Sequence, residues 1–185
     1  MPPVRLSPGL LLDEEEFRIE GAVLDHGIPC LAFAFEEKLR VNVWREGLSR
    51  LGLPVGPWLR EAKRAVRQGA PDHSEVCVRD GLVSSLGDLK RHALRTAPGQ
   101  KIAYAVDLAY NERNIEKVVA LARDADQLFI EAPFLDADAN IARQAGDIAK
   151  RACVTRLIPF HFSARYRERA DELTSEAETT NAAAE

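Results

Sequence analysis

Three short apolar runs separated by two amphipathic stretches dominate the second half of the sequence. The runs cover residues 101–106, 127–130 and 156–160, and each has the length of a buried strand. Between them, residues 112–124 and 142–152 repeat apolar side chains every three or four positions, which is typical of helices that bury one face. This order predicts a βαβαβ unit, and such units are almost always right-handed with parallel strands.

Each of the three runs ends at a polar residue that can take part in chemistry, namely Asp107, Glu131 and His161. Parallel strands would place all three at one edge of the sheet, where open α/β sheets bind ligands. Carboxylates and imidazoles bind metals, but zinc normally takes three or four protein ligands, and Asp and His are also common in caps and loops. The pattern alone therefore predicts an α/β or α+β globular domain with a candidate metal or anion site.

The first half of the chain alternates apolar and polar residues in the manner of half-buried strands. Residues 17–23 and 31–35 show this alternation, and a strand at 39–43 would complete an antiparallel meander. A helix is expected at 57–68, and the Asp-Gly pair at 80–81 predicts a hairpin turn. The first half thus predicts an antiparallel sheet followed by helices.

We expect a single, partial domain over residues 1–173. Residues 1–10 carry three prolines and a glycine and read as an irregular lead-in. Apolar residues thin out after Arg167, so residues 174–185 are expected to form a disordered tail.

The composition is that of an ordinary globular protein, with 46% hydrophobic and 29% charged residues among 185. The net charge of -4 means that a nucleic acid would have to meet a local basic patch. One basic run lies on the helix expected at 57–68, and we read it as a solvated helix surface rather than a contact to phosphates. It consists of Arg60, Lys63, Arg64 and Arg67.

The three cysteines, Cys30, Cys77 and Cys153, are widely spaced in apolar surroundings. They suggest reduced, buried thiols and therefore a cytoplasmic location. No apolar stretch approaches about 20 residues, so the sequence predicts neither a membrane span nor a secretion signal.

Several collinear segments resemble a known family. They are FRIEGAVLDHGIPCLAFAFEEK from Phe17, LGLPVGPWLREAKRAVRQG from Leu51, AYAVD ending at Asp107, LFIEAPFLD from Leu128, RQAGDIAKRA from Arg143 and RLIPFHFSARY from Arg156. In this order they resemble the ribonuclease Z family of metallo-β-lactamase-fold hydrolases. The resemblance covers nearly the whole chain, and it implies an αββα sandwich of which this chain supplies the second half and part of the first.

The resemblance also implies a site with two zinc ions that hydrolyses a phosphodiester on the 3′ side of precursor transfer RNA. Asp107 matches the family aspartate that bridges the two ions, and His161 matches the histidine that binds the second ion. Glu131 matches an acid that would orient ligands through hydrogen bonds. His26 matches a family histidine outside the metal set, and it can also be read as a turn residue that pins two strands.

Arg165 and Tyr166 match residues just past the metal ligand, where an arginine could bind a phosphate, although packing of that loop explains them equally well. The sequence departs from the family elsewhere. The His-x-His-x-Asp-His zinc cluster has no counterpart, and the segment 135–143 is short and lacks the histidine that resembles a proton donor. His73 and His92 match no ligand and read as surface residues.

These departures leave two interpretations open. The chain is either part of a zinc-dependent endoribonuclease that is incomplete or inactive alone, with weak or absent zinc, or a non-catalytic interaction module of the same fold. Its partners would be precursor transfer RNA if it is active, and either a second copy or a chain that supplies the missing half, because the sheet face with Phe17, Ile19, Phe33 and Phe35 would otherwise lack cover. A nucleotide-binding or receiver domain would need a glycine-rich first turn or a clustered acidic pair, and this sequence has neither.

Overall fold

The computed structural model describes residues 9–133, 141–166 and 169–182. It divides the chain into two compact units, of which one combines the residues up to Glu36 with those from Gln100 onward, and the other comprises Glu37–Gly99. The second unit is inserted between two strands that pair with each other in the first unit. This differs from the single domain expected over 1–173, because residues 37–99 enclose a hydrophobic core of their own.

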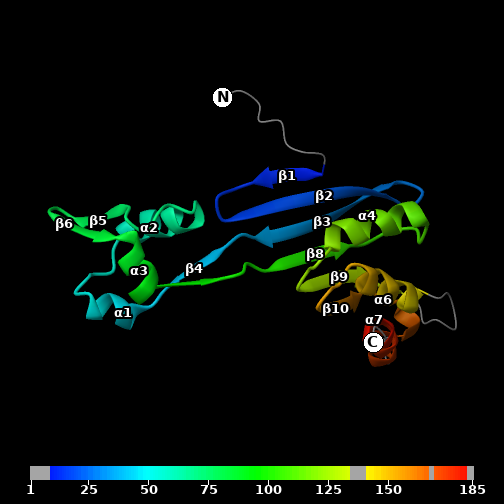
Figure 1. The fold of residues 1–185 in the computed structure, drawn as a ribbon. Helices are drawn as coiled ribbons and strands as arrows, with labels where there is room; N and C mark the ends of the chain where they lie inside the picture. Colours follow the sequence, from blue (N-terminus) through cyan, green and yellow to red (C-terminus); the bar gives the residue numbers. More distant parts are fainter. Residues whose placement is uncertain (1–8, 134–140, 167–168, 183–185) are drawn as a thin grey trace, which may run out of the picture. The chain divides into compact units, whose positions relative to one another are not determined.

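The first unit is built on a six-stranded sheet with the order β1-β2-β3-β8-β9-β10 (Figure 1). The strands are β1 (Leu10–Asp13), β2 (Phe17–Asp25), β3 (Pro29–Glu37), β8 (Lys101–Ala105), β9 (Gln127–Glu131) and β10 (Arg156–Phe160). Strands β8, β9 and β10 run parallel, and the helices α4 (Glu112–Ala122) and α6 (Ile141–Arg151) connect them. The predicted βαβαβ unit is therefore confirmed.

The predicted antiparallel meander is wrong in its third strand. The strand β4 (Arg40–Val43) pairs with β7 (Leu94–Ala97) in the second unit, while β3 pairs with β8. The lead-in also contains a strand, because Leu10–Asp13 pairs with β2 through an irregular register. Local alternation identified these segments as extended, but it carries no information about which partner completes the hydrogen bonds.

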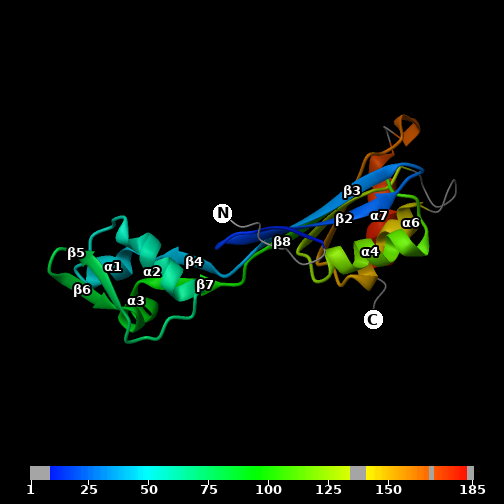
Figure 2. The same cartoon turned by 90° about the horizontal axis from the view of Figure 1, so that it is seen from above.

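One side of the sheet, the helix face, packs on α4 and α6, which lie on the same side of the strands in Figure 2. Its central positions are alanines that are at most 2% exposed, namely Ala32, Ala34, Ala103 and Ala105. Small side chains let the helices approach the strands closely. The alanines of β3 therefore mark its core-facing side. The larger Phe33 and Phe35 point to the other side and are 38% and 41% exposed.

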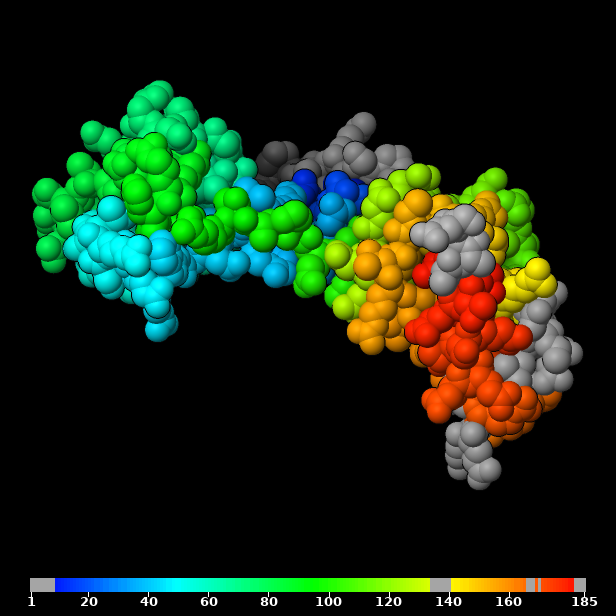
Figure 3. All heavy atoms as spheres, turned by 60° about the horizontal axis from the view of Figure 1, so that its bottom comes forward, coloured from blue at the N-terminus to red at the C-terminus, as the bar shows by residue number. Residues whose placement is uncertain are grey.

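The last described segment is a helix, α7 (Ala170–Ala182), where the sequence predicted a disordered tail from residue 174. Leu173 and Ala177 of this helix are fully buried, and α7 packs against α6 and β10, as the adjoining red, orange and yellow atoms of Figure 3 show. These two apolar residues are enough to dock α7, because both lie on the side of the helix that packs against its neighbours.

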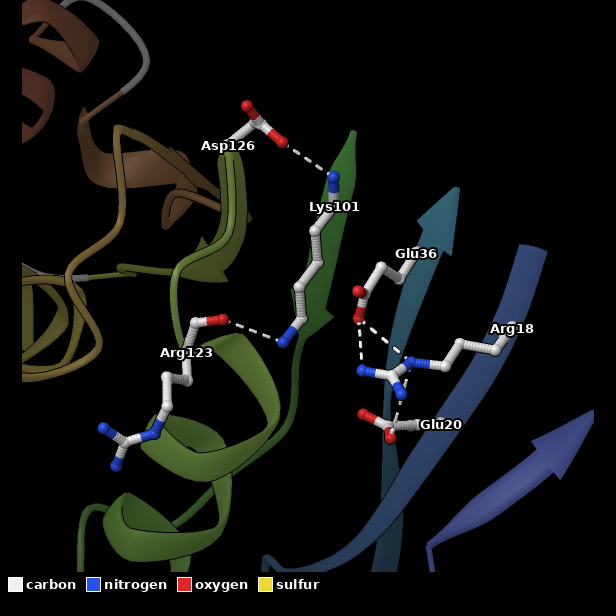
Figure 4. A network of polar contacts seen from close by, with 6 residues as sticks. All are labelled: Arg18, Glu20, Glu36, Lys101, Arg123 and Asp126. Atoms are coloured by element: carbon white, nitrogen blue, oxygen red, sulfur yellow. Dashed lines mark hydrogen bonds and ion pairs between the residues drawn. The ribbon is translucent and has the colours of Figure 1, made fainter. Parts of the chain in front are cut away.

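Polar contacts tie the ends of the strands together in the first unit (Figure 4). Arg18 donates two hydrogen bonds to the Glu36 carboxylate, at 3.0 and 2.7 Å, which join β2 to β3. The main-chain N–H of Lys101 donates to Asp126 at 2.7 Å, and its ammonium group donates to the carbonyl of Arg123 at 2.8 Å. These bonds fix the start of β8 against the turn between α4 and β9.

The second unit contains the β4–β7 pair, the hairpin of β5 (Glu75–Arg79) and β6 (Leu82–Ser85), and three helices. The helices are α1 (Arg45–Arg50), α2 (Trp58–Arg67) and α3 (Leu86–His92). The expected Asp-Gly hairpin is confirmed, with Gly81 at a φ of 74°. The sequence pattern did not indicate α3, which begins where Ser85 Oγ accepts a hydrogen bond from the N–H of Asp88.

The three cysteines are free, as expected, but they are not buried. Cys77 and Cys153 are exposed, and Cys30 is partly exposed. Cys77 occupies an outward position of β5, and Cys153 comes just after the end of α6, so an apolar run in the sequence did not show which of its side chains are buried. Within the described ranges, no helix is both long and apolar enough to cross a membrane.

The packing of α7 on α6 yields a prediction at Gly146. A Cβ atom at this position would lie 2.5 Å from the carbonyl oxygen of Ala177 and 2.6 Å from Cβ of Thr180. Gly146→Ala should therefore lower the free energy of unfolding by about 1–3 kcal/mol, although Gly→Ala in an exposed helix raises it by up to about 1 kcal/mol. Urea-induced unfolding measures the change.

The control for this prediction is Asp147→Ala on the exposed side of the same helix, which should change the free energy of unfolding by less than about 0.5 kcal/mol. A stabilised Gly146→Ala protein would show that α7 does not dock on α6 as described.

Candidate metal centre

Asp107, Glu131 and His161 meet at the carboxyl edge of the three parallel strands. Phe160 is the register partner of Glu131, and Ala105 is the partner of Ile130, so the three strands end level with one another. One ligand atom from each of Asp107, Glu131 and His161 lies within 4.8 Å of the other two. The expected convergence of these residues follows directly from the parallel register.

The backbone turns sharply at two of these three positions. Asp107 has a φ of 50° and His161 a φ of 60°, both in the left-handed region that residues other than glycine seldom adopt. Such conformations cost on the order of 1 kcal/mol each and persist only where the surroundings impose them. Here they aim the side chains of both residues from their strand ends toward the same point.

The buried carboxylate of Glu131, only 8% exposed, holds the two flanking segments. Its Oε1 accepts a hydrogen bond from the main-chain N–H of Leu108 at 2.9 Å, directly after Asp107. Its Oε2 lies 3.3 Å from Nδ1 of His161. The carboxylate of Glu131 thus contacts both the turn at Asp107 and the imidazole of His161.

This contact also selects how His161 can bind a metal. An ionised carboxylate oxygen can only accept, so the tautomer that satisfies this contact has its proton on Nδ1, which donates a hydrogen bond to Glu131. The Nε2 then keeps its lone pair, and the imidazole is 57% exposed. A carboxylate that orients a histidine in this way is the usual arrangement behind a metal-bound imidazole.

Tyr110 adds a contact that the sequence analysis did not identify. Its hydroxyl donates to the main-chain carbonyl of Glu131 at 3.1 Å. Burial, and next the negative charge of Glu131, raises the pKa of the Tyr110 hydroxyl, so it stays protonated and keeps donating. A tyrosine three residues after a strand-end aspartate offered no signal in the sequence for this role.

Asn114 is the second residue that the sequence analysis missed. It is fully buried on α4, where its amide donates to the carbonyls of Asp25, at 2.7 Å, and of Ala109, at 2.8 Å. Its Oδ1 accepts from the N–H of Asp25 at 3.0 Å. One side chain therefore joins the turn before His26 to the loop after Asp107. A polar residue among the apolar positions of a helix was the available signal.

A cleft of about 490 Å³ opens at this edge of the sheet. Its walls include His26, Asp107, Glu131 and His161, so the structure brings His26 to the site even though it lies outside the ligand cluster. His26 also sits in the tight turn between β2 and β3, where its N–H donates to the carbonyl of Ile28 at 3.0 Å. Both interpretations of this residue fit its position.

The two expected substrate contacts lie in a short 3-10 turn, Ala164–Tyr166. Arg165 is exposed and follows Ala164, which lines the cleft. The side chain of Tyr166 and most of the segment 135–143 lie outside the described residues. His73 and His92 are exposed on the second unit, as expected for surface residues.

The donor set fits a metal in kind but not in number. Asp107 supplies a carboxylate oxygen and His161 an imidazole nitrogen, while both oxygens of Glu131 already have partners within the protein. Two ligands leave at least half of a tetrahedral zinc shell to other groups. Within the described ranges, these three residues form the cluster that could hold a metal ion.

The fold is that of a metallo-β-lactamase-fold protein. The crystal structure of the metallo-beta-lactamase fold protein YhfI from Bacillus subtilis superposes with a TM-score of 0.51 at 17% identity, over 97% of this chain and 49% of that chain. In sequence, the chain is 32% identical over 168 residues to ribonuclease Z of Deinococcus radiodurans and 34% identical over 170 residues to that of Microcystis aeruginosa. No protein-family model matches it.

The resemblance to ribonuclease Z is thus confirmed, and it concerns one part of those proteins. The two alignments take in 86% and 87% of this chain but only 48% and 49% of the relatives. The chain therefore spans about half the length of the ribonucleases Z that it matches.

We predict that Asn114→Ala lowers the free energy of unfolding by about 2–4 kcal/mol, because it removes three hydrogen bonds of a fully buried side chain, to the N–H and carbonyl of Asp25 and to the carbonyl of Ala109. Thermal or urea-induced unfolding measures this loss. The matched control is Glu116→Ala, an exposed position on the same helix, which should stay within about 0.5 kcal/mol. Equal stability of the two variants would contradict the role assigned to Asn114.

We predict that Glu131→Gln weakens zinc binding about 10–100-fold. The amide of the new residue would face the Nδ1 proton of His161 with a donor, which favours the tautomer that points an N–H at the metal. His161→Ala should remove the binding that exists, since it deletes a ligand. Calorimetric titration with Zn²⁺ measures both, and Glu116→Gln is the control. Unchanged affinity in His161→Ala would place the site elsewhere.

Proposed function

We propose that this chain is one part of a ribonuclease Z-like, zinc-dependent phosphodiesterase that cleaves the 3′ side of precursor transfer RNA, and that it is inactive alone. The observation that supports this most is the convergence of Asp107, Glu131 and His161 at the end of three parallel strands, in a chain related to ribonuclease Z over most of its length. Asp107 would bridge two zinc ions, and His161 would bind one of them.

Each group of the site has a role in this proposal. Bound zinc would supply Lewis-acid stabilisation of phosphoryl oxygens and a nucleophilic water at neutral pH. Glu131 holds the ligands in place through its bonds to Leu108 and His161. His26 orients groups at the cleft wall, and Arg165 and Tyr166 would contact the phosphate of the substrate. The remaining ligands and a proton donor would come from residues other than the 185 described by this sequence.

The charge distribution favours an RNA substrate. The second unit, Glu37–Gly99, contains 12 Lys and Arg residues against seven Asp and Glu, a net +5 within a chain of net -4. The rest of the chain therefore carries -9. Exposed Arg60 and Arg64 lie on α2 of this unit, and they would supply the local basic surface that a nucleic acid requires, although the same run also reads as a solvated helix surface. Free thiols fit the reducing cytoplasm, where we place the protein.

A second candidate function is a non-catalytic interaction module of the same fold. The large apolar side chains that remain exposed on the sheet, such as Phe33 and Tyr104, favour this reading. In that case the strand-end cluster would be a remnant of the family site with a structural use.

We predict that the isolated chain cleaves neither precursor transfer RNA nor a small phosphodiester above background, with or without added Zn²⁺ or Mn²⁺. Losing a whole ligand cluster removes the activated water and the charge stabilisation together, which is far more than a single increment of binding. Gel analysis of labelled RNA measures the cleavage. Zinc-dependent cleavage by this chain alone that disappears in Asp107→Ala would contradict the incompleteness of the site.

The decisive experiment is a chimera in which this chain replaces the matched half of the Deinococcus radiodurans ribonuclease Z. We expect the chimera to cleave precursor transfer RNA, to lose the activity with Asp107→Ala, and to keep it with Asp147→Ala at an exposed helix position. A folded, zinc-binding chimera without activity would favour the interaction module.

A further inference from the structure

A second pocket, of about 240 Å³, lies in the first unit beside the turn between β2 and β3, and we call it the turn pocket. Its walls come from this turn and from α4, and they include Val23, Gly27, Ile28, Pro29, Arg113 and Lys117. Arg113 and Lys117 are one helical turn apart, so both side chains lie on the same face of α4. The turn pocket therefore combines two cations with an apolar wall.

The guanidinium of Arg113 has no hydrogen bond or ion pair with any of the residues that the structure describes. The acidic groups near it are engaged elsewhere. Glu112 accepts from Arg151 at 3.0 Å, and Oδ1 of Asp25 accepts from the N–H of Gly27 at 2.9 Å. A guanidinium that lines a pocket with all its donors unused is suited to bind an anion with several oxygens, such as a phosphate.

The second cation of the turn pocket is held in a fixed place. The ammonium group of Lys117 donates to the main-chain carbonyl of Val23, which ties it to β2. An ammonium group has three donors, so two of them remain for a ligand. Two cations thus face the single carboxylate of Asp25, and the pocket is a positive spot in an otherwise acidic unit.

The apolar wall of the turn pocket is open to solvent. Ile28 is 67% exposed and Val23 is 55% exposed. Apolar side chains beside an unpaired guanidinium offer a base or a ribose a surface to pack on while the attached phosphate binds the cations. The pocket is smaller than the roughly 300–1,000 Å³ of sites that enclose a whole small molecule. Its size therefore suits one unit of a longer ligand.

The turn pocket adjoins the candidate metal centre through a single residue. His26 lines the cleft of the metal centre, whereas its two neighbours in the chain, Asp25 and Gly27, line the turn pocket. Asn114 ties this turn to α4 through both backbone groups of Asp25, so the two cavities are held in a fixed relation. A strand that lies across the turn would reach both of them.

We infer that the turn pocket binds one nucleotide of a single-stranded RNA, with its phosphate on Arg113 and Lys117 and its base or ribose against the wall around Ile28. The inference rests on the proposed function, because the strand would be the one that also passes the metal cleft. It adds to that function a contact point for the RNA outside the site of cleavage. Free phosphate shares the anionic chemistry, but the apolar wall offers that ion nothing.

The test is a titration of the full chain, without metal, with a single-stranded RNA hexanucleotide, followed through the amide resonances of Gly27 and Ile28 by NMR. We expect both amides to shift and to saturate. Arg113→Ala should weaken the binding seen at these amides about 3–10-fold at low salt, and Arg113→Lys should restore part of it. Losing one phosphate contact should also reduce the slope of log affinity against log salt by about 0.7.

The matched control is Arg156→Ala, which removes the same charge from an exposed position at the start of β10, the end of that strand away from His161. It should leave the affinity at these amides unchanged. The inference is overturned if RNA shifts neither Gly27 nor Ile28, or if Arg113→Ala binds as tightly as the unaltered chain. Inorganic phosphate that binds there as tightly as the RNA would overturn it too, because the pocket would then recognise an ion and no nucleotide. The titration needs no cleavage, so an inactive chimera counts against the proposed function alone.

Discussion

The site depends on the two contacts made by the buried carboxylate of Glu131. It stands at the end of the middle parallel strand and accepts from the loop after β8 on one oxygen and from His161 on the other. With both oxygens engaged inside the protein, it serves as the frame of the site, and the exposed ligand atoms belong to Asp107 and His161. The two left-handed residues of this edge, Asp107 and His161, are the two that it holds.

Around this frame, buried polar groups connect segments that are far apart in sequence. Asn114 joins the β2–β3 turn to the loop after β8, across 89 residues in one direction and five in the other. Tyr110 closes the same loop onto β9. Because the Asn114 side chain is fully buried and Tyr110 largely so, these bonds are costly to leave unmade, and they hold the strand ends in place.

The two sides of the sheet serve different ends. The helix face uses alanines to bring α4 and α6 close, and the larger Phe33 and Phe35 lie on the opposite side of the sheet. The inserted second unit adds a basic surface to a chain that is otherwise acidic. The strand-end cluster and the basic unit are thus carried by separate parts of a chain that spans about half the length of the ribonucleases Z that it matches.

The sequence by itself determined the βαβαβ unit and the meeting of Asp107, Glu131 and His161, because helical and strand periods are local and parallel crossovers have one hand. Only the tertiary structure decided which side of β3 faces the core, because alanine and phenylalanine alternate along this strand and both of its faces are therefore apolar. It also decided that β4 pairs with β7, that two apolar residues suffice to dock α7, and that Asn114 and Tyr110 support the site. Those outcomes depend on partners distant in sequence, which no local pattern contains.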